Sequence, residues 1–154
     1  MRLLIYGDYE CPYTHRAVIS VEQVRDQLGD DLVYAFRNFP LTEIHPHALH
    51  AALAAEAAAL QDKFWEMHDL LFRHQGALTD DDLVAHAASI GLDGDRFRAD
   101  FADRKGLPRI QADVESGIAS GVEGTPSIFI NGKQHLDGYD SSSLAGALRF
   151  AMGP

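Results

Sequence analysis

The sequence predicts an α/β fold, and three observations carry that prediction. Short apolar segments that suit β-strands occupy residues 2–6 and 32–39, and the segment between them has helical spacing. No strand pattern appears between about 43 and 104, where the sequence is helical in character. Further on, an Asn131-Gly132 pair flanked by apolar residues is the signal of a β-hairpin. Two strands joined by a helix imply parallel pairing with a right-handed crossover.

The elements that flank the helical middle follow from local signals. Apolar residues recur at helical spacing over residues 17–28, and Gly29 is placed to end that helix. The hairpin should pair residues 127–130 with residues 133–136. We therefore expect a sheet built from a βαβ unit and a later hairpin.

The helices expected after the second strand cover residues 48–60, 63–74, 79–90, 93–103 and 107–120, and a last helix covers 140–152. Thr79 is the expected N-cap of its helix, because acidic residues that suit a first turn follow it. Helical spacing places Ile118 and Phe150 on inward faces, and Trp65 is expected in the core rather than in a substrate groove.

Length and charge limit the possible functions. A chain of 154 residues fits one domain, so we treat the helical stretch at about 43–104 as an insertion into it. The net charge of −10 argues against nucleic acid and against an anionic membrane surface as partners. One cysteine fits a reducing compartment, and no signal peptide is visible. We expect a cytoplasmic location, although a fragment of a longer precursor would look the same.

The single cysteine, Cys11, stands where the first strand pattern gives way to a helix. Pro12 suits the first helical position, which places Cys11 at the N-cap. The unpaired N–H groups and the dipole of a helix start stabilise an anion, and the thiolate is the reactive form of cysteine. A lone cysteine is more often a small buried apolar residue. The polar residues within 8–15 favour the reactive interpretation.

Residues 8–13 read Asp-Tyr-Glu-Cys-Pro-Tyr, and this turn resembles the active site of the thioredoxin superfamily, most closely that of its DsbA-like branch. Residues 38–41, 45–46 and 63–68 are similar to stretches of small bacterial members of that branch. The resemblance covers nearly the whole chain. It implies a thioredoxin-like fold with a helical insertion between the second strand and a cis-proline loop. One position departs from the pattern: Thr14 stands where most relatives carry a second, resolving cysteine.

Gly124-Thr125-Pro126, directly before the hairpin, resembles the cis-proline loop of the same family. The resemblance implies that the Thr125–Pro126 peptide bond is cis and that the loop lies against the active-site cysteine. It also implies that the backbone of Thr125 pairs with an extended substrate, as an added strand would. Gly124 should permit the turn that leads into the loop.

The leading hypothesis is a thiol–disulfide oxidoreductase that uses Cys11 as its only nucleophile. Thr14 cannot resolve a mixed disulfide, so an external thiol such as glutathione must do so. The Thr14 hydroxyl is expected to donate a hydrogen bond to the thiolate. Pro12 and Tyr13 complete the candidate catalytic turn. His15 would favour the thiolate if it were protonated, and a solvated helix residue is an equally good interpretation.

Three alternatives remain open on the sequence alone. One is a glutathione transferase or isomerase of the kappa-like type, which the short chain and Cys11 in place of a serine disfavour. Another is a non-catalytic thioredoxin-like binding module. The third is that Thr14 was introduced by design in place of a resolving cysteine. Protein or small-molecule disulfides are the expected partners, and no resident cofactor is expected.

Eight histidines raise the question of a metal site. His45, His47 and His50 lie close together in the sequence, but structural zinc sites need four ligands and catalytic ones three with a second shell. No carboxylate stands at convincing spacing beside them. We therefore expect no metal.

Overall fold

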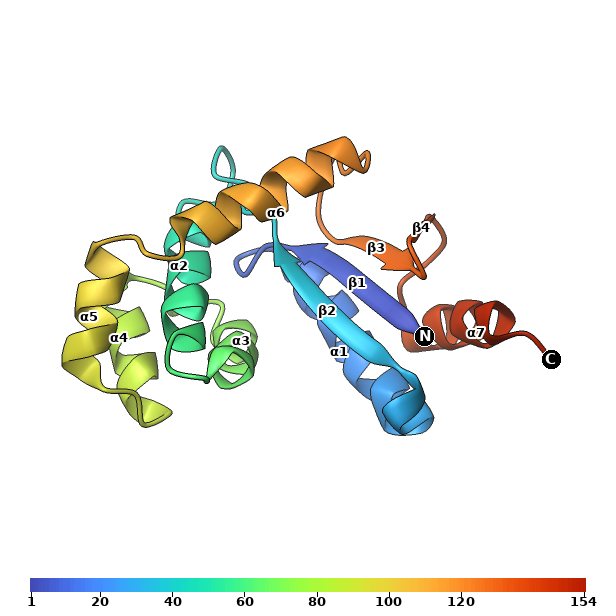
Figure 1. The fold of residues 1–154 in the computed structure, drawn as a ribbon, viewed down its shortest axis with the longest axis horizontal. Helices are drawn as coiled ribbons and strands as arrows, with labels where there is room; N and C mark the ends of the chain where they lie inside the picture. Colours follow the sequence, from blue (N-terminus) through green and yellow to red (C-terminus); the bar gives the residue numbers. More distant parts are fainter.

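The computed structural model describes residues 1–154 and contains a four-stranded mixed sheet flanked by helices (Figure 1). The strands are β1 (Arg2–Gly7), β2 (Val33–Asn38), β3 (Ser127–Ile130) and β4 (Lys133–His135), in the spatial order β2-β1-β3-β4. β1 pairs in parallel with β2 and antiparallel with β3, and β3 and β4 form the hairpin. This topology confirms the predicted α/β class and the thioredoxin-like fold.

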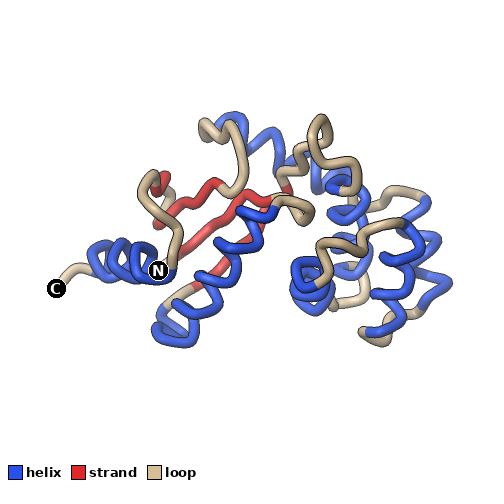
Figure 2. Tube along the Cα trace, turned by 180° about the vertical axis from the view of Figure 1, so that it is seen from behind, coloured by secondary structure: helices blue, strands red, loops and turns tan.

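The helices are α1 (Pro12–Leu28), α2 (Ala48–Ala59), α3 (Phe64–Arg73), α4 (Asp80–Ser89), α5 (Gly94–Ala102), α6 (Leu107–Ala119) and α7 (Ser141–Met152), and a 3-10 turn at Gly29–Asp31 follows α1. α1 lies behind β1 and β2 in the view of Figure 1 and contacts α7, which lies at the right, and Figure 2 shows α1 in front of the strands and running along them. Helices α2 to α5 gather beside the sheet, and α6 leads back over it. No helix is long and apolar enough to cross a lipid bilayer.

The two faces of β1 pack against different helices, because successive strand residues point to opposite sides of a sheet. Leu3 and Ile5 are buried in the main apolar cluster, which also contains residues of α1 and α7. Tyr6 belongs to a smaller cluster with Phe129, and Val114 of α6 packs against that cluster. The sheet is therefore covered by α1 and α7 on one face and by α6 on part of the other.

Asn38, at the end of β2, joins the sheet to the inserted helices. Its side-chain amide donates to Glu56 of α2 at 2.8 Å and to Asp113 of α6 at 3.0 Å. Close packing reinforces this junction: a Cβ on Gly117 of α6 would lie 2.9 Å from ring carbons of Phe39. Burial raises the pKa of the Glu56 carboxyl above its ordinary value. The insertion is thus fixed to the sheet where β2 ends.

Three apolar side chains predicted to be inside are exposed. Ile118 is 64% exposed, because Gly117 faces the sheet and the next residue is turned away by about 100°. Phe150 is 90% exposed, because it lies two residues beyond the buried Leu148 and so on the opposite side of α7. Trp65 is 41% exposed and lies at the margin of the core rather than within it.

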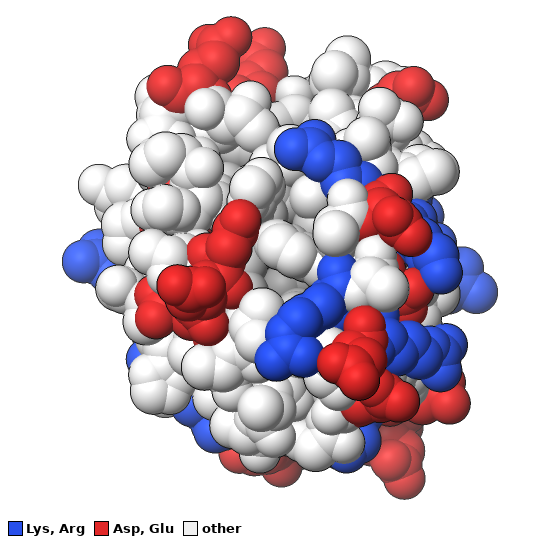
Figure 3. Space-filling view, turned by 90° about the vertical axis from the view of Figure 1, so that its left-hand side faces the viewer, with Lys and Arg blue, Asp and Glu red and all other residues white.

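The face formed by the inserted helices carries basic and acidic side chains side by side (Figure 3). Asp100 of α5 is buried and is paired with Lys105 at 2.6 Å and with Arg96 at 3.7 Å. The charge of Asp100 is therefore compensated locally.

His68 of α3 is fully buried among aromatic rings, with Phe36 and Phe72 in edge-to-face contact. Its Nδ1 is hydrogen-bonded to the hydroxyl of Tyr9 at 3.0 Å. Burial disfavours the charged imidazole and lowers the pKa of His68 from 6.5 to about 3. The folded state therefore holds this side chain neutral where the unfolded chain would protonate it.

This burial predicts acid sensitivity. As the pH falls from 6.5 towards 3, the unfolded state binds a proton that the folded state excludes, so the free energy of unfolding falls by up to about 1.4 kcal/mol per pH unit. His68→Gln keeps an acceptor for Tyr9 and should remove most of that slope, as measured by urea unfolding at several pH values. His47→Gln, at an exposed position, is the control. Equal slopes for wild type and His68→Gln would contradict the prediction.

Candidate active site at the start of helix α1

Cys11 is the N-cap of α1, as the sequence predicts. Its backbone is extended, with φ −78° and ψ 119°, and Pro12 occupies the first turn. The amide N–H of Thr14 donates to Cys11 Sγ at 3.4 Å. No acidic residue lies in the first turn of the helix. The side chain is 3% exposed, so the sulfur lies just beneath the surface at the positive end of α1.

The loop before β3 closes over the other side of the sulfur. Cys11 Sγ lies 3.7 Å from the carbonyl oxygen of Thr125, and the Thr125–Pro126 peptide bond is cis. The hydroxyl of Ser127 donates to the carbonyl of Gly124 at 2.7 Å and holds the start of the loop. The N–H of Thr125 has no hydrogen-bond partner within the chain. The structure thus brings together the two segments that the sequence singles out, although 114 residues separate them.

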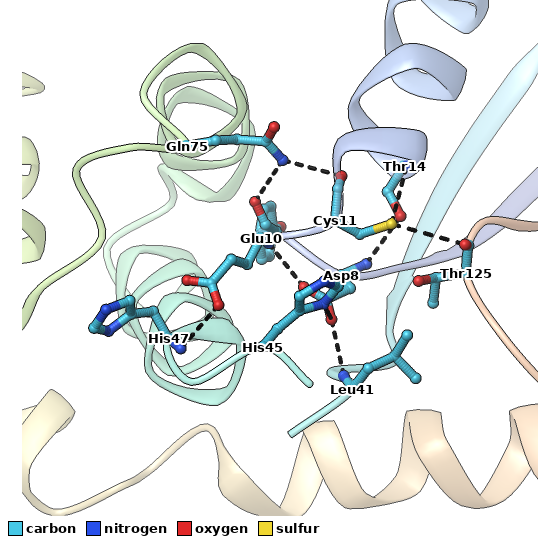
Figure 4. A network of polar contacts seen from close by, with 10 residues as sticks. Asp8, Glu10, Cys11, Thr14, Leu41, His45, His47, Gln75 and Thr125 are labelled. Carbon is cyan, nitrogen blue, oxygen red and sulfur yellow. Dashed lines mark hydrogen bonds and ion pairs between the residues drawn. The ribbon is translucent and has the colours of Figure 1, made fainter. Parts of the chain in front are cut away.

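A buried carboxylate, Asp8, organises the turn that carries the cysteine (Figure 4). Its Oδ1 accepts from the amide of Glu10 at 2.7 Å, and its Oδ2 accepts from the amide of Leu41 at 2.8 Å. Nδ1 of His45 lies 2.8 Å from the same Oδ2. The backbone carbonyl of Asp8 also accepts from the amide of Cys11 at 3.1 Å. One residue therefore ties the active-site turn to the segment that follows β2.

The inserted helices contribute a second support. Gln75, in the loop after α3, donates its side-chain amide to the carbonyls of Tyr9 at 2.9 Å and Cys11 at 3.0 Å. The carboxylate of Glu10 accepts from the amide of His47 at 3.2 Å. The cysteine turn is thus held from both sides by segments that belong to the insertion.

The other predicted catalytic residues lie around this turn, but their side chains do not all make the contacts that the sequence predicts. The hydroxyl of Thr14 accepts from the amide of Asp8 at 3.4 Å and has no hydrogen bond to the sulfur, so the backbone of Thr14 makes the contact expected of its side chain. Tyr13 is exposed, with the guanidinium of Arg16 over its ring. The ring of His15 stacks on Phe72 and makes no hydrogen bond to Cys11.

Asp8 lies in the turn that the sequence singles out but was assigned no role there, and His45 and Gln75 were not predicted as parts of the site. Asp8 and His45 are 37 residues apart, and Gln75 is 64 residues from Cys11, so no local pattern joins them. The structure pairs His45 with Asp8 and His50 with Asp80, and it gathers no group of three potential metal ligands. The sequence does hold a signal for the Asp8–His45 pair: Asp8 follows the first predicted strand closely, and His45 comes shortly before the predicted helix at 48–60.

The sequence of this chain is similar to a known protein family and to one part of longer curated proteins. A sequence model of a family described as thioredoxin matches residues 2–149. A curated relative, the Na⁺/H⁺ antiporter NhaA 1 of Salinispora arenicola, is 46% identical over 147 residues, which make up 96% of this chain and 22% of the relative. The chain spans about a quarter of the length of the curated relatives it matches.

Solved structures share the fold over nearly the whole chain. The thiol-disulfide exchange protein α-DsbA2 of Wolbachia pipientis is 25% identical, with a TM-score of 0.79 over 97% of this chain and 81% of that protein. A thioredoxin-like oxidoreductase of Silicibacter pomeroyi is 24% identical, with a TM-score of 0.87 over 99% and 87%. The predicted resemblance to DsbA-like proteins is confirmed at the level of the fold.

The hydrogen bonds of Asp8 predict a large effect of removing its carboxylate. Asp8→Ala would leave two backbone amides and an imidazole without their acceptor in a buried site, so we expect a loss of about 3–5 kcal/mol in the free energy of unfolding, measured by urea denaturation. Asp26→Ala, on the exposed side of α1, is the control and should change it by less than about 0.5 kcal/mol. Similar small losses in both variants would contradict this role of Asp8.

Proposed function

We propose that this chain, which belongs to the thioredoxin family, is a thiol–disulfide oxidoreductase of the DsbA-like type with Cys11 as its single nucleophile. The observation that carries the proposal is the position of the Cys11 sulfur between the amide of Thr14 and the carbonyl of Thr125. A helix start favours the thiolate, and the neighbouring loop offers backbone groups to a substrate.

The proposed reaction has two exchanges. In the first, the thiolate of Cys11 attacks one sulfur of a substrate disulfide, a mixed disulfide with Cys11 forms, and the other substrate sulfur leaves as a thiolate that takes up a proton. In the second, an external thiol loses its proton and attacks the substrate sulfur of the mixed disulfide, which releases Cys11 as a thiolate. Thr14 has no sulfur with which to carry out this second step within the chain, so we propose glutathione or another small thiol as the co-substrate.

We propose that the loop at Thr125 receives the substrate. Its free N–H and its carbonyl can pair with an extended chain that approaches the sulfur, as in the addition of a strand. Gly124 and Pro126 shape this loop, and the exposed ring of Tyr13, two residues after Cys11, offers apolar contact. His15 lies on the next part of α1, where a protonated imidazole would favour the thiolate. Protein or small-molecule disulfides are the proposed substrates.

The curated relatives carry a name that the proposed redox function does not explain. They are called Na⁺/H⁺ antiporters, and the match to this chain covers 22–25% of each of the first relatives. We propose that the shared segment is a redox domain in all of these proteins and that antiport belongs to the other three quarters of the relatives. The cytoplasmic location stays a prediction.

A thioredoxin-like binding module is the second candidate, and the burial of the sulfur favours it. Cys11 is 3% exposed, so a substrate must displace part of the surrounding loop to reach it. A binding module would bind a partner at the same surface without turnover. Measuring disulfide exchange separates the two candidates.

We expect the wild-type protein to reduce a peptide–glutathione mixed disulfide with glutathione as the reductant, and Cys11→Ser to abolish this turnover. Thr14→Cys should form an internal disulfide with Cys11 and exchange protein disulfides without added glutathione, because the second thiol then resolves the intermediate. Ser20→Cys, six residues or about 1.7 turns beyond Thr14 on α1, supplies a thiol without the required proximity and is the control. Wild-type rates equal to those of Cys11→Ser would leave the binding module as the better proposal.

A further inference from the structure

A buried carboxylate lies beside the turn that carries the sulfur, where its charge opposes the chemistry proposed for Cys11. Asp8 is 1% exposed and precedes Cys11 by three residues. Like charges close together disfavour each other, so an ionised Asp8 works against a thiolate in the same turn. Glu10 adds a second carboxylate to this turn. A site that needs a thiolate therefore needs a positive charge to balance Asp8.

The side chain placed to balance Asp8 is His45. Its Nδ1 lies 2.8 Å from Asp8 Oδ2. The imidazole is partly exposed, and its Nε2 has no partner within the chain and is not among the buried polar atoms that lack one. A ring that holds a carboxylate through Nδ1 and keeps Nε2 open to solvent can gain or lose a proton without losing the contact.

We propose that His45 is a positioning residue whose protonation controls the reactivity of Cys11 through Asp8. With His45 protonated, the thiolate lies next to a neutral ion pair. With His45 neutral, the thiolate lies next to an uncompensated carboxylate and forms less readily. This proposal rests on the proposed function only in taking Cys11 as the nucleophile.

A continuous chain of hydrogen bonds connects Asp8 to the sulfur. The carbonyl of Asp8 accepts from the amide of Cys11 at 3.1 Å, and the amide of Asp8 donates to the Thr14 hydroxyl at 3.4 Å. The amide of Thr14 in turn donates to the sulfur. Figure 4 shows Asp8 between His45 and the cysteine turn. His45, Asp8 and the sulfur are therefore held in one fixed arrangement of hydrogen bonds, through which a change of charge on His45 is felt at the sulfur.

Of the groups hydrogen-bonded to Asp8, His45 alone can carry a positive charge. His15 of α1 is a second imidazole near the cysteine turn, but its ring stacks on Phe72 and makes no hydrogen bond to Asp8 or Cys11, and it is unchanged in every variant compared below.

Gln75 and Thr125 contribute neutral groups to the cysteine turn, and Glu10 contributes a negative one. His47 is the nearest other imidazole in the sequence, but it is exposed and its side chain makes no hydrogen bond. His47 therefore provides a matched control for His45.

The test is the rate of alkylation of Cys11 by iodoacetamide as a function of pH, which needs neither a disulfide substrate nor an external thiol. His45→Asn keeps a donor near the position of Nδ1 but cannot be protonated. In wild type we expect two ionisations in the rate profile. In His45→Asn we expect one, with rates roughly five- to tenfold lower on the acid side and equal to wild type on the alkaline side, the size expected for two charges near a protein surface. His47→Asn should follow wild type throughout.

Two results would overturn the proposal. A His45→Asn profile that superimposes on wild type would show that the charge of His45 does not reach the sulfur. A constant ratio between the two profiles at every pH would show a structural role alone, and unfolding midpoints of both variants check for that. Failure of the proposed function would look different, because the wild type would then show no disulfide turnover whatever the shape of its alkylation profile.

Discussion

A carboxylate taken out of water must be surrounded by donors, and Asp8 finds its donors in its own turn and on a segment that is distant in the sequence. One amide comes from its own turn, another from the residue after Pro40, and an imidazole from the segment that leads into α2. The first group is placed by the turn after β1, and the other two are placed by the segment between β2 and α2. The shape of the cysteine turn therefore depends on β1, β2 and the insertion being in their final positions together.

The helical insertion is consequently part of the active site and not an appendage of the sheet. It supplies His45 on one side of the cysteine turn and Gln75 on the other. Its attachment at Asn38 fixes both contributions relative to β1, because Asn38 is the residue paired with Gly7 directly before Asp8. The same junction keeps Glu56 and Asp113 close to a single amide, so the connection is polar as well as apolar.

The parts of the structure that depend on neighbouring residues could be read from the sequence. The N-cap position of Cys11 follows from Pro12, and the capping box of α4 follows from Thr79 and the acids after it. The hairpin follows from Asn131-Gly132, and both residues have the positive φ that such a turn requires.

Contacts between distant segments could not be read in this way. The hydrogen bond from the Thr14 amide, in place of its hydroxyl, depends on how the side chain is turned towards Asp8. The pairing of Asp8 with His45 depends on how far the chain travels after β2 before α2 begins. Ile118 was misplaced because helical spacing gives the relative orientation of side chains but does not show how much of a helix the sheet covers. Phe150 was misplaced for a simpler reason, because two residues after Leu148 is the opposite side of the same helix.

The long separation between Cys11 and Thr125 also has a consequence for the newly made chain. β1 and β2 pair across a single helix, whereas β1 and β3 pair only after more than a hundred intervening residues have been made and brought back. Contacts of such long range carry a large loop-closure entropy and tend to form late in folding. The thiol is synthesised 114 residues before Thr125, so during translation it is uncovered until the loop that later shields it has been made. Small thiols and oxidants can therefore react with Cys11 before the Thr125 loop covers it.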